Sequence, residues 1–301
     1  NPSSAPGPDG LHPRLLRECA SELSIPLSLI YEKSMAQGVL PIDWKSTHVS
    51  PIFKKGSRQS AANYRPINLA SVPAKIMESM IKDSLVNHLR LNDCITPSQH
   101  GFLPGRSCTT NLIEYLNVIT KAIDDGNSYD VIMCDFAKAF DKIPFDCMLM
   151  KVAAHGIQGK LFHWIENWTK DRRQRVVLNG VHSSWKDVLS SVVQGSVIGP
   201  ILFIIFINDI DLAIPDPITR IYKYADDSKL GRPVRSPEDA AALQSAIHSV
   251  AKWAERWGME IHPTKILVMH FGHNNEKYEY ELNGVKISHV ASARDLGVIV
   301  N

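Results

Sequence analysis

Residues 220–230 read RIYKYADDSKL, in which two runs of strand-like composition flank a pair of adjacent aspartates. The runs Arg220–Tyr224 and Ser228–Leu230 predict the strands of a hairpin, with Ala225, Asp226 and Asp227 at its turn. A turn at the end of paired strands holds carboxylates in fixed positions. Because Asp-Asp pairs commonly serve the turn itself, this stretch gains a chemical meaning only from the segments around it.

A third carboxylate follows a buried-strand pattern elsewhere in the chain. The apolar run Val131–Cys134 ends at Asp135. Acids at strand ends can bind Mg²⁺, which takes one or two carboxylates together with phosphate oxygens and water. Two such ions can activate an attacking hydroxyl and stabilise a leaving pyrophosphate. Taken singly, each acid is more commonly a turn former or a helix cap, and Asp141 is predicted to cap the helix after it.

The segments around these acids predict an α+β fold. Apolar spacing predicts helices over Val72–Leu89, Phe145–Val152 and Val197–Ile207, and a further helix that Ser236 caps, Pro237 begins and Gly258 ends. Strand patterns occur at Arg175–Leu178, Val188–Val193, Ile266–Phe271 and Tyr278–Leu282. This order favours an antiparallel sheet with helices on one face.

Composition alone does not indicate a function. The 301 residues carry a formal net charge of only +2, so bulk charge gives no argument for a nucleic-acid partner. The five cysteines have no zinc-ligand spacing and fit free thiols in a reducing compartment. The chain begins without Met and stops abruptly at Asn301, which predicts a piece of a longer polypeptide.

The ordered set of motifs resembles the reverse transcriptases of non-LTR (LINE-type, jockey-like) retrotransposons. The matching segments are Gly7–Gly10, Asn63–Ile67, Gly101–Ser107, Asp135–Asp141, Gln194–Ser196 with Gly199-Pro200 and Asn208-Asp209, Tyr224–Asp227, Lys265 and Leu296–Val298. Each piece is weak alone, but the ordered set is specific and covers nearly the whole chain. The resemblance implies the right-hand polymerase fold, with an N-terminal extension and fingers over 1–115. It implies a palm over 116–301, with finger elements around 160–190 and an end at the primer-grip region, and no thumb.

The resemblance also implies the roles of individual residues. Asp135, Asp226 and Asp227 would bind two Mg²⁺ ions, for which Mn²⁺ could substitute, and Lys265 would protonate or neutralise the leaving pyrophosphate. The residues implied in nucleotide binding are Phe136 through its backbone, Phe140, Gln194, Gly195, Arg65 and, as a weaker candidate, Lys54. The Phe140 ring would clash with a 2′-hydroxyl and so select deoxynucleotides. In the second motif, Val193 and Ser191 replace the proline and glycine that are common there.

The implied partners are an RNA template, a DNA primer and dNTPs, with an endonuclease elsewhere in the full polyprotein and no membrane. The implied location is intracellular, and nuclear during action on target DNA. Two basic clusters, Lys54-Lys55-Arg58 and Lys170-Arg172-Arg173-Arg175, either follow a nucleic-acid backbone or form solvated faces. Two alternatives stay open: a decayed or co-opted RNA-binding copy, and a maturase or viral RNA-copying enzyme, which Phe140 disfavours.

Overall fold

The computed structural model describes residues 2–3, 5–192 and 195–301, which form two compact units. The first unit contains residues 1–92 and 143–205, and the second contains residues 93–142 and 206–301. These units are compact parts of the chain and do not test the predicted boundaries of fingers (1–115) and palm (116–301), which stay a prediction. Within the described residues, no helix combines the length and apolar character needed to cross a bilayer.

The first unit is built largely from helices. They are α1 (Pro13–Glu18), α2 (Ala20–Gln37), α3 (Val72–Leu91), α6 (Phe145–Ala154), α7 (Gly159–Thr169) and α8 (Gly199–Ile207). The last two residues of α8 belong to the second unit. Two short 3-10 helices, η1 (Ile42–Lys45) and η2 (Ala61–Asn63), lie between α2 and α3. The helices predicted over Val72–Leu89 and Phe145–Val152 are confirmed as α3 and α6. The Ser71 side chain caps α3 by accepting a hydrogen bond from the Ala74 N–H, and Trp164 and Trp168 lie fully buried in the core.

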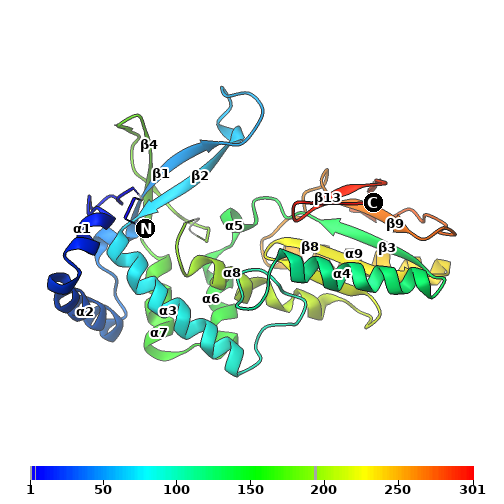
Figure 1. Cartoon of the computed structure of the whole chain (residues 1–301), viewed down its shortest axis with the longest axis horizontal. Helices are drawn as coiled ribbons and strands as arrows, with labels where there is room; N and C mark the ends of the chain where they lie inside the picture. Colours follow the sequence, from blue (N-terminus) through cyan, green and yellow to red (C-terminus); the bar gives the residue numbers. More distant parts are fainter. Residues whose placement is uncertain (1, 4, 193–194) are drawn as a thin grey trace. The chain divides into compact units, whose positions relative to one another are not determined.

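A five-stranded sheet completes the first unit (Figure 1). It contains β1 (Ser46–Phe53), β2 (Tyr64–Ala70), β4 (Arg173–Leu178), β5 (Val181–His182) and β6 (Lys186–Asp187). Strand β1 pairs antiparallel with β2 and parallel with β4. The strand predicted at Val188–Val193 is wrong over its described residues, where only Ser190 forms a bridge, to Pro144. Ser191 has a φ of 125°, which an extended strand cannot contain.

The second unit contains the sheet that carries the predicted acids. Its strand order is β12 (Ser288–His289), β9 (Leu267–Phe271), β3 (Ser128–Cys134), β8 (Asp227–Val234) and β7 (Arg220–Tyr224). Strand β3 pairs antiparallel with β8 and β9, whereas β12 joins β9 in parallel. The strand predicted at Tyr278–Leu282 is confirmed only at its end, as β10 (Glu281–Leu282), paired with β11 (Val285–Lys286). The buried Tyr280 instead donates its hydroxyl proton to Asp130, at 2.6 Å.

Helices cover both faces of this sheet, which differs from the predicted single face. On β8, the Lys229 side chain bonds to Asn111 of α4 (Cys108–Asp124), whereas Arg232 bonds to Asp239 of α9 (Pro237–Arg256). Side chains alternate along a strand, so these two residues point to opposite faces. The α+β fold class itself is confirmed. The unit also contains α5 (Ala139–Lys142), η3 (Asn208–Ala213) and the hairpin of β13 (Ala293–Asp295) with β14 (Val298–Val300).

Candidate active site

The predicted aspartate hairpin is present, and its turn is tight. The β7–β8 ladder closes with the pair Tyr224 and Asp227, so Ala225 and Asp226 form the turn between them. Ala225 has a φ of 56°, a left-handed conformation that such turns require and that glycine adopts with less strain. The hairpin therefore presents Asp226 and Asp227 at one end of the sheet.

Asp135 lies at the same end of the sheet as the hairpin turn. The β3–β8 register pairs Cys134 with Ser228, and its continuation by one residue places Asp135 beside Asp227. The backbone at Asp135 is fixed from the other side, because its carbonyl accepts a hydrogen bond from the His262 N–H at 2.7 Å. The next bond of the same bridge runs from the Ala137 N–H to the Glu260 carbonyl, at 2.8 Å. Two segments far apart in the sequence thus bring their carboxylates together.

Lys265 supplies the positive charge at this site. Its ammonium nitrogen lies 2.5 Å from Oδ2 of Asp135, and both side chains keep part of their surface exposed. The short loop before β9 carries the lysine to this position, with a backbone bond from the Lys265 N–H to the His262 carbonyl. Lys265 is a site residue predicted from the sequence, and its ammonium directly contacts Asp135, a predicted metal ligand.

The concentration of acids changes their protonation. Burial raises the pKa of Asp226 to about 6, and the charges of Asp227 and Asp135 add to this rise. The pKa of Asp227 is also raised, first by burial and then by the charges of Asp135 and Asp295. Acids with raised pKa values in one place are typical of a site that a cation or a reacting group neutralises.

The three aspartates could bind a divalent metal ion as a partial set of ligands, with substrate and water supplying the rest. Among residues 2–3, 5–192 and 195–301, no three His, Cys, Asp or Glu side chains stand close enough to enclose a metal ion. A complete protein cage is unnecessary for Mg²⁺, which combines one or two carboxylates with substrate phosphates and water. Burial and neighbouring carboxylates together raise the pKa of Asp226, and this unneutralised negative charge is the observation that favours such an ion. Asp135, Asp226 and Asp227 are the residues that would hold it.

A buried glutamine that sequence analysis misses supports the aspartate turn. The side-chain oxygen Oε1 of Gln99 accepts hydrogen bonds from the N–H groups of Ala225, at 2.9 Å, and Gly101, at 2.7 Å. A Cβ on Gly101 would lie 2.4 Å from the Ala225 nitrogen, so only glycine fits there. The available signal is the Gly101–Ser107 motif, which resembles a finger motif but contacts the turn.

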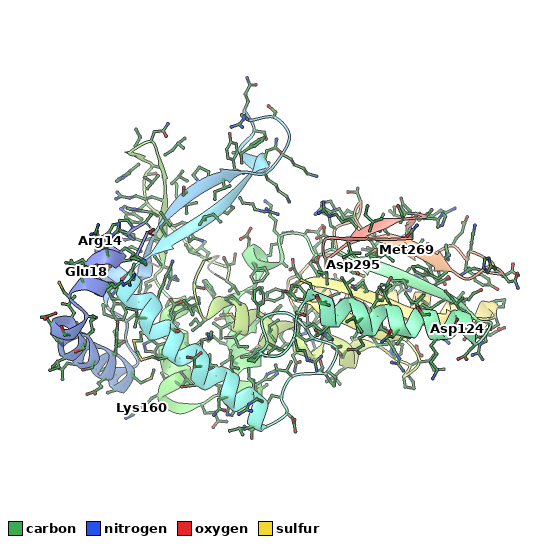
Figure 2. The ribbon with its side chains drawn as sticks, in the orientation of Figure 1. Arg14, Glu18, Asp124, Lys160, Met269 and Asp295 are labelled. Atoms are coloured by element: carbon green, nitrogen blue, oxygen red, sulfur yellow. The ribbon has the colours of Figure 1, made fainter. Side chains whose placement is uncertain are left out.

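A second missed group is a buried ion pair close to the turn. Lys229 lies on β8 just after Asp227, and its ammonium bonds to Asp295 at 2.5 Å and to Asn111 at 2.8 Å. The same ammonium lies 4.6 Å from the centre of the Tyr115 ring. Asp295 belongs to the C-terminal hairpin, on which Figure 2 labels it. The pair therefore links β8 to the hairpin predicted as the start of the primer grip.

The two predicted phenylalanines occupy different surroundings. Phe136 is buried and forms an antiparallel bridge with Ile261. Because the hydrogen bonds of this bridge involve Asp135 and Ala137, the Phe136 N–H points to the opposite edge of the segment. Phe140 lies in α5, where its ring meets the Phe102 ring edge-on, with centroids 6.4 Å apart. Their nucleotide-binding roles stay predictions.

The other predicted nucleotide-binding residues belong to the first unit. Arg65 on β2 and Lys54 after β1 are exposed. Gly195 has a φ of 96°, and a Cβ there would lie 2.8 Å from the Asn68 carbonyl oxygen, so this position requires glycine. Gln194 lies outside the described residues. The three predicted metal ligands therefore all lie in the second unit, whereas Arg65, Lys54 and Gly195 belong to the first.

The structure divides the second predicted basic cluster. Arg172 is buried, its guanidinium donates to the Trp168 carbonyl at 3.0 Å, and burial lowers its pKa to about 10. Lys170 forms an ion pair with Glu166 at 2.7 Å. Both readings of the cluster, a surface for phosphates and a solvated face, are wrong for Arg172, because its side chain is buried and its guanidinium lies over the Trp168 ring.

The fold of this chain is that of the right-hand polymerases. A telomerase structure from Candida tropicalis, truncated from its C-terminal domain, superposes with a TM-score of 0.59 at 12% identity. The alignment covers 91% of this chain and 59% of the telomerase chain, and at this identity it shows the fold alone.

The family is shown by sequence. The model of the family "Reverse transcriptase (RNA-dependent DNA polymerase)" matches residues 52–300, and the chain belongs to that family. The RNA-directed DNA polymerase from the mobile element jockey of Drosophila melanogaster is 27% identical over 99% of this chain and 33% of its own length. A probable RNA-directed DNA polymerase from the Drosophila melanogaster transposon BS is 26% identical over 99% of this chain and 34% of its own length. The predicted likeness to jockey-type polymerases is confirmed, and the chain spans about a third of these relatives.

Proposed function

We propose that this chain forms the nucleotidyl-transfer site of an RNA-directed DNA polymerase from a non-LTR retrotransposon. The observation that carries the proposal is the meeting of Asp135, the Asp226–Asp227 turn and Lys265 at one end of the second sheet. Family membership supports the reaction class, and the raised pKa of Asp226 supports a site built for cations. The reaction joins a dNTP to a primer 3′-hydroxyl and releases pyrophosphate.

The proposed cofactors are two Mg²⁺ ions, for which Mn²⁺ substitutes. Asp135, Asp226 and Asp227 would hold them, and the bound ions would supply activation of the hydroxyl and stabilisation of the charge on the phosphates. Paired strands hold these carboxylates in fixed positions, because Asp135 follows the end of β3 and the other two lie at the β7–β8 turn.

The ion pair with Asp135 supports a catalytic role for Lys265. Its ammonium now neutralises Asp135. We infer that the Lys265 ammonium donates a proton to the leaving pyrophosphate or neutralises its charge. Phe140 would exclude a 2′-hydroxyl, and Arg65, Lys54, Gln194, Gly195 and the Phe136 backbone would contact the nucleotide or template.

The proposed partners follow from the same family. They are an RNA template, a DNA primer and dNTPs, with an endonuclease in the rest of a longer polyprotein. Action on target DNA would take place in the nucleus. The relatives named above are about three times as long as this chain, which supports the presence of further domains in the complete protein.

The test is incorporation of a single dNTP on an RNA template annealed to a DNA primer, in the presence of Mg²⁺. We expect Asp226→Asn to lower the rate by at least about 10³-fold, because an amide cannot replace a metal-binding carboxylate. The matched control is Asp124→Asn, an exposed acid at the end of α4 that Figure 2 shows far from Asp295. Incorporation that survives Asp226→Asn contradicts the proposal, and RNA binding without any incorporation in the parent chain favours a co-opted RNA-binding fragment.

A further inference from the structure

The first unit carries a cluster of planar and basic side chains that the proposed reaction does not use. The Trp185 ring lies 4.8 Å from the guanidinium carbon of Arg173 and 4.5 Å from that of Arg175. The His48 ring stacks on Trp185 at 6.0 Å between centroids, with 29° between the planes. The His182 ring lies 5.3 Å from His48. These five residues are called the Trp185 cluster.

The sheet register places the members of the cluster on one face. Strands β1 and β4 pair Ser46 with Arg173 and His48 with Arg175, so both arginines and His48 point to the same side. The Val177–His182 pair of β4 and β5 extends this face. Asp187 is the acidic neighbour, since it lies opposite Arg173 in the β4–β6 ladder. Two guanidiniums outweigh this single carboxylate, so the face is positive.

Hydrogen bonds hold the two arginines in position. Arg173 donates its Nε–H to the Ser46 hydroxyl at 2.9 Å, and Arg175 donates its Nε–H to Nε2 of His48 at 3.1 Å. Burial lowers the pKa of His48, and the Arg175 and His182 charges add to this effect, so the imidazole is neutral and able to accept. A guanidinium has four further N–H groups on its terminal nitrogens, which are suited to phosphate oxygens.

The Trp185 cluster differs in exposure from an arginine–tryptophan pair that stabilises the core. Arg173 and His182 are exposed, and Arg175, His48 and Trp185 are half-buried. The adjacent Arg172 also stacks on a tryptophan, but it is buried and donates to the Trp168 carbonyl. Arg172 therefore stabilises the core, whereas the Trp185 cluster offers its positive charge and flat rings to solvent.

We propose that the Trp185 cluster binds a single strand of nucleic acid, with Arg173 and Arg175 on its phosphates and the planar side chains against its bases. Proteins that hold single strands combine positive charge with aromatic side chains on which bases stack. Single-stranded RNA and single-stranded DNA both present phosphates and unpaired bases to the cluster. Only the choice of RNA as the strand rests on the proposed function. Duplexes keep their bases stacked internally, so the cluster favours single strands.

The test measures binding of the full chain to labelled oligonucleotides of about 15 nucleotides by fluorescence anisotropy, with oligo(rU), oligo(dT) and an RNA–DNA duplex as separate arms. We expect Arg173→Gln with Arg175→Gln to weaken single-strand binding about tenfold. The slope of log affinity against log salt falls by about 1.4, for two lost phosphate contacts. Trp185→Ala weakens the same binding and affects the duplex less. A loss confined to one single-strand arm identifies that strand as the ligand.

The matched control is Arg256→Gln, which removes an exposed arginine stacked on Trp257, 5.5 Å from that ring, in the second unit. Circular dichroism shows whether each variant folds, and Trp185→Phe keeps a flat ring and restores binding. Unchanged affinity in the folded double-arginine variant, or equal losses for single strand and duplex, overturns the proposal. The binding assay contains neither dNTP nor Mg²⁺, so a failed polymerase test and a failed binding test are distinguishable.

Discussion

At the scale of single residues, the Asp226 carboxylate lowers the free energy of unfolding when it is ionised. Its pKa is raised to about 6 by burial and by its acidic neighbours, above the ordinary value near 3.8. The folded chain therefore holds this proton more tightly than the unfolded chain does. Stability falls as pH rises from about 4 through 6, and the ionised site destabilises the fold at neutral pH. A cation held by these carboxylates would neutralise the charge and remove the destabilisation.

The first prediction is that Asp226→Asn stabilises the metal-free chain while it abolishes incorporation. At pH 7 we expect a gain of about 1 kcal/mol, after allowance for solvent screening, that disappears near pH 4. Chemical denaturation at both pH values measures it. Asp135→Asn is the control, because it also removes the ion pair with Lys265 and should bring no gain. A loss of stability in Asp226→Asn at pH 7 contradicts this account.

A second prediction concerns Ser191. Its φ of 125° lies in a region that glycine adopts without strain, and glycine is common at this position of the motif. Ser191→Gly should stabilise the chain by about 1 kcal/mol, since relief of strain exceeds the added freedom of the unfolded chain. Urea denaturation measures the change. Ser190→Gly, at the adjacent position in the bridge to Pro144, should destabilise the chain. Stabilisation by both variants would point away from strain at Ser191.

At the scale of elements, the buried Lys229–Asp295 pair fastens β13 to β8 next to the aspartate turn. Removal of one partner leaves a buried charge without its neutralising group. Asp295→Leu should therefore destabilise the chain by about 3 kcal/mol and raise the KM for primer. The double variant Lys229→Met with Asp295→Leu should recover most of the stability. A single variant as stable as the parent would show that the pair does not fasten the hairpin.

The elements also show what the sequence can predict. The aspartate hairpin, β3, α3 and α9 follow from apolar periodicity and capping residues, and the structure confirms them. Helix α4 has no counterpart among the predicted helices, although the sequence carries its signals: Ser107 and Thr110 form a capping box, and Leu112, Tyr115 and Ile119 recur at helical spacing. The contacts of Gln99 with Ala225 and of Lys229 with Asp295 join distant parts of the chain, so no local pattern reveals them.

At the scale of the whole molecule, the site depends on topology. Its acids come from separate stretches of the second unit, and the β3–β8 pairing brings them to one end of the sheet. Motifs of the family predict which residues matter, whereas the pairing explains why they act together. The Trp185 cluster and the predicted Arg65 site belong to the first unit, so both units contribute to the proposed contacts with nucleic acid.

The most direct measurement is a Mn²⁺ titration of the full chain followed by electron paramagnetic resonance, with a dNTP present. The account predicts Mn²⁺ binding that weakens below about pH 6, as Asp226 becomes protonated. Asp135→Asn and Asp226→Asn should each abolish at least one bound ion, while Asp124→Asn binds like the parent chain. Mn²⁺ binding that is unchanged in both site variants would contradict the claim that these carboxylates form one cation site.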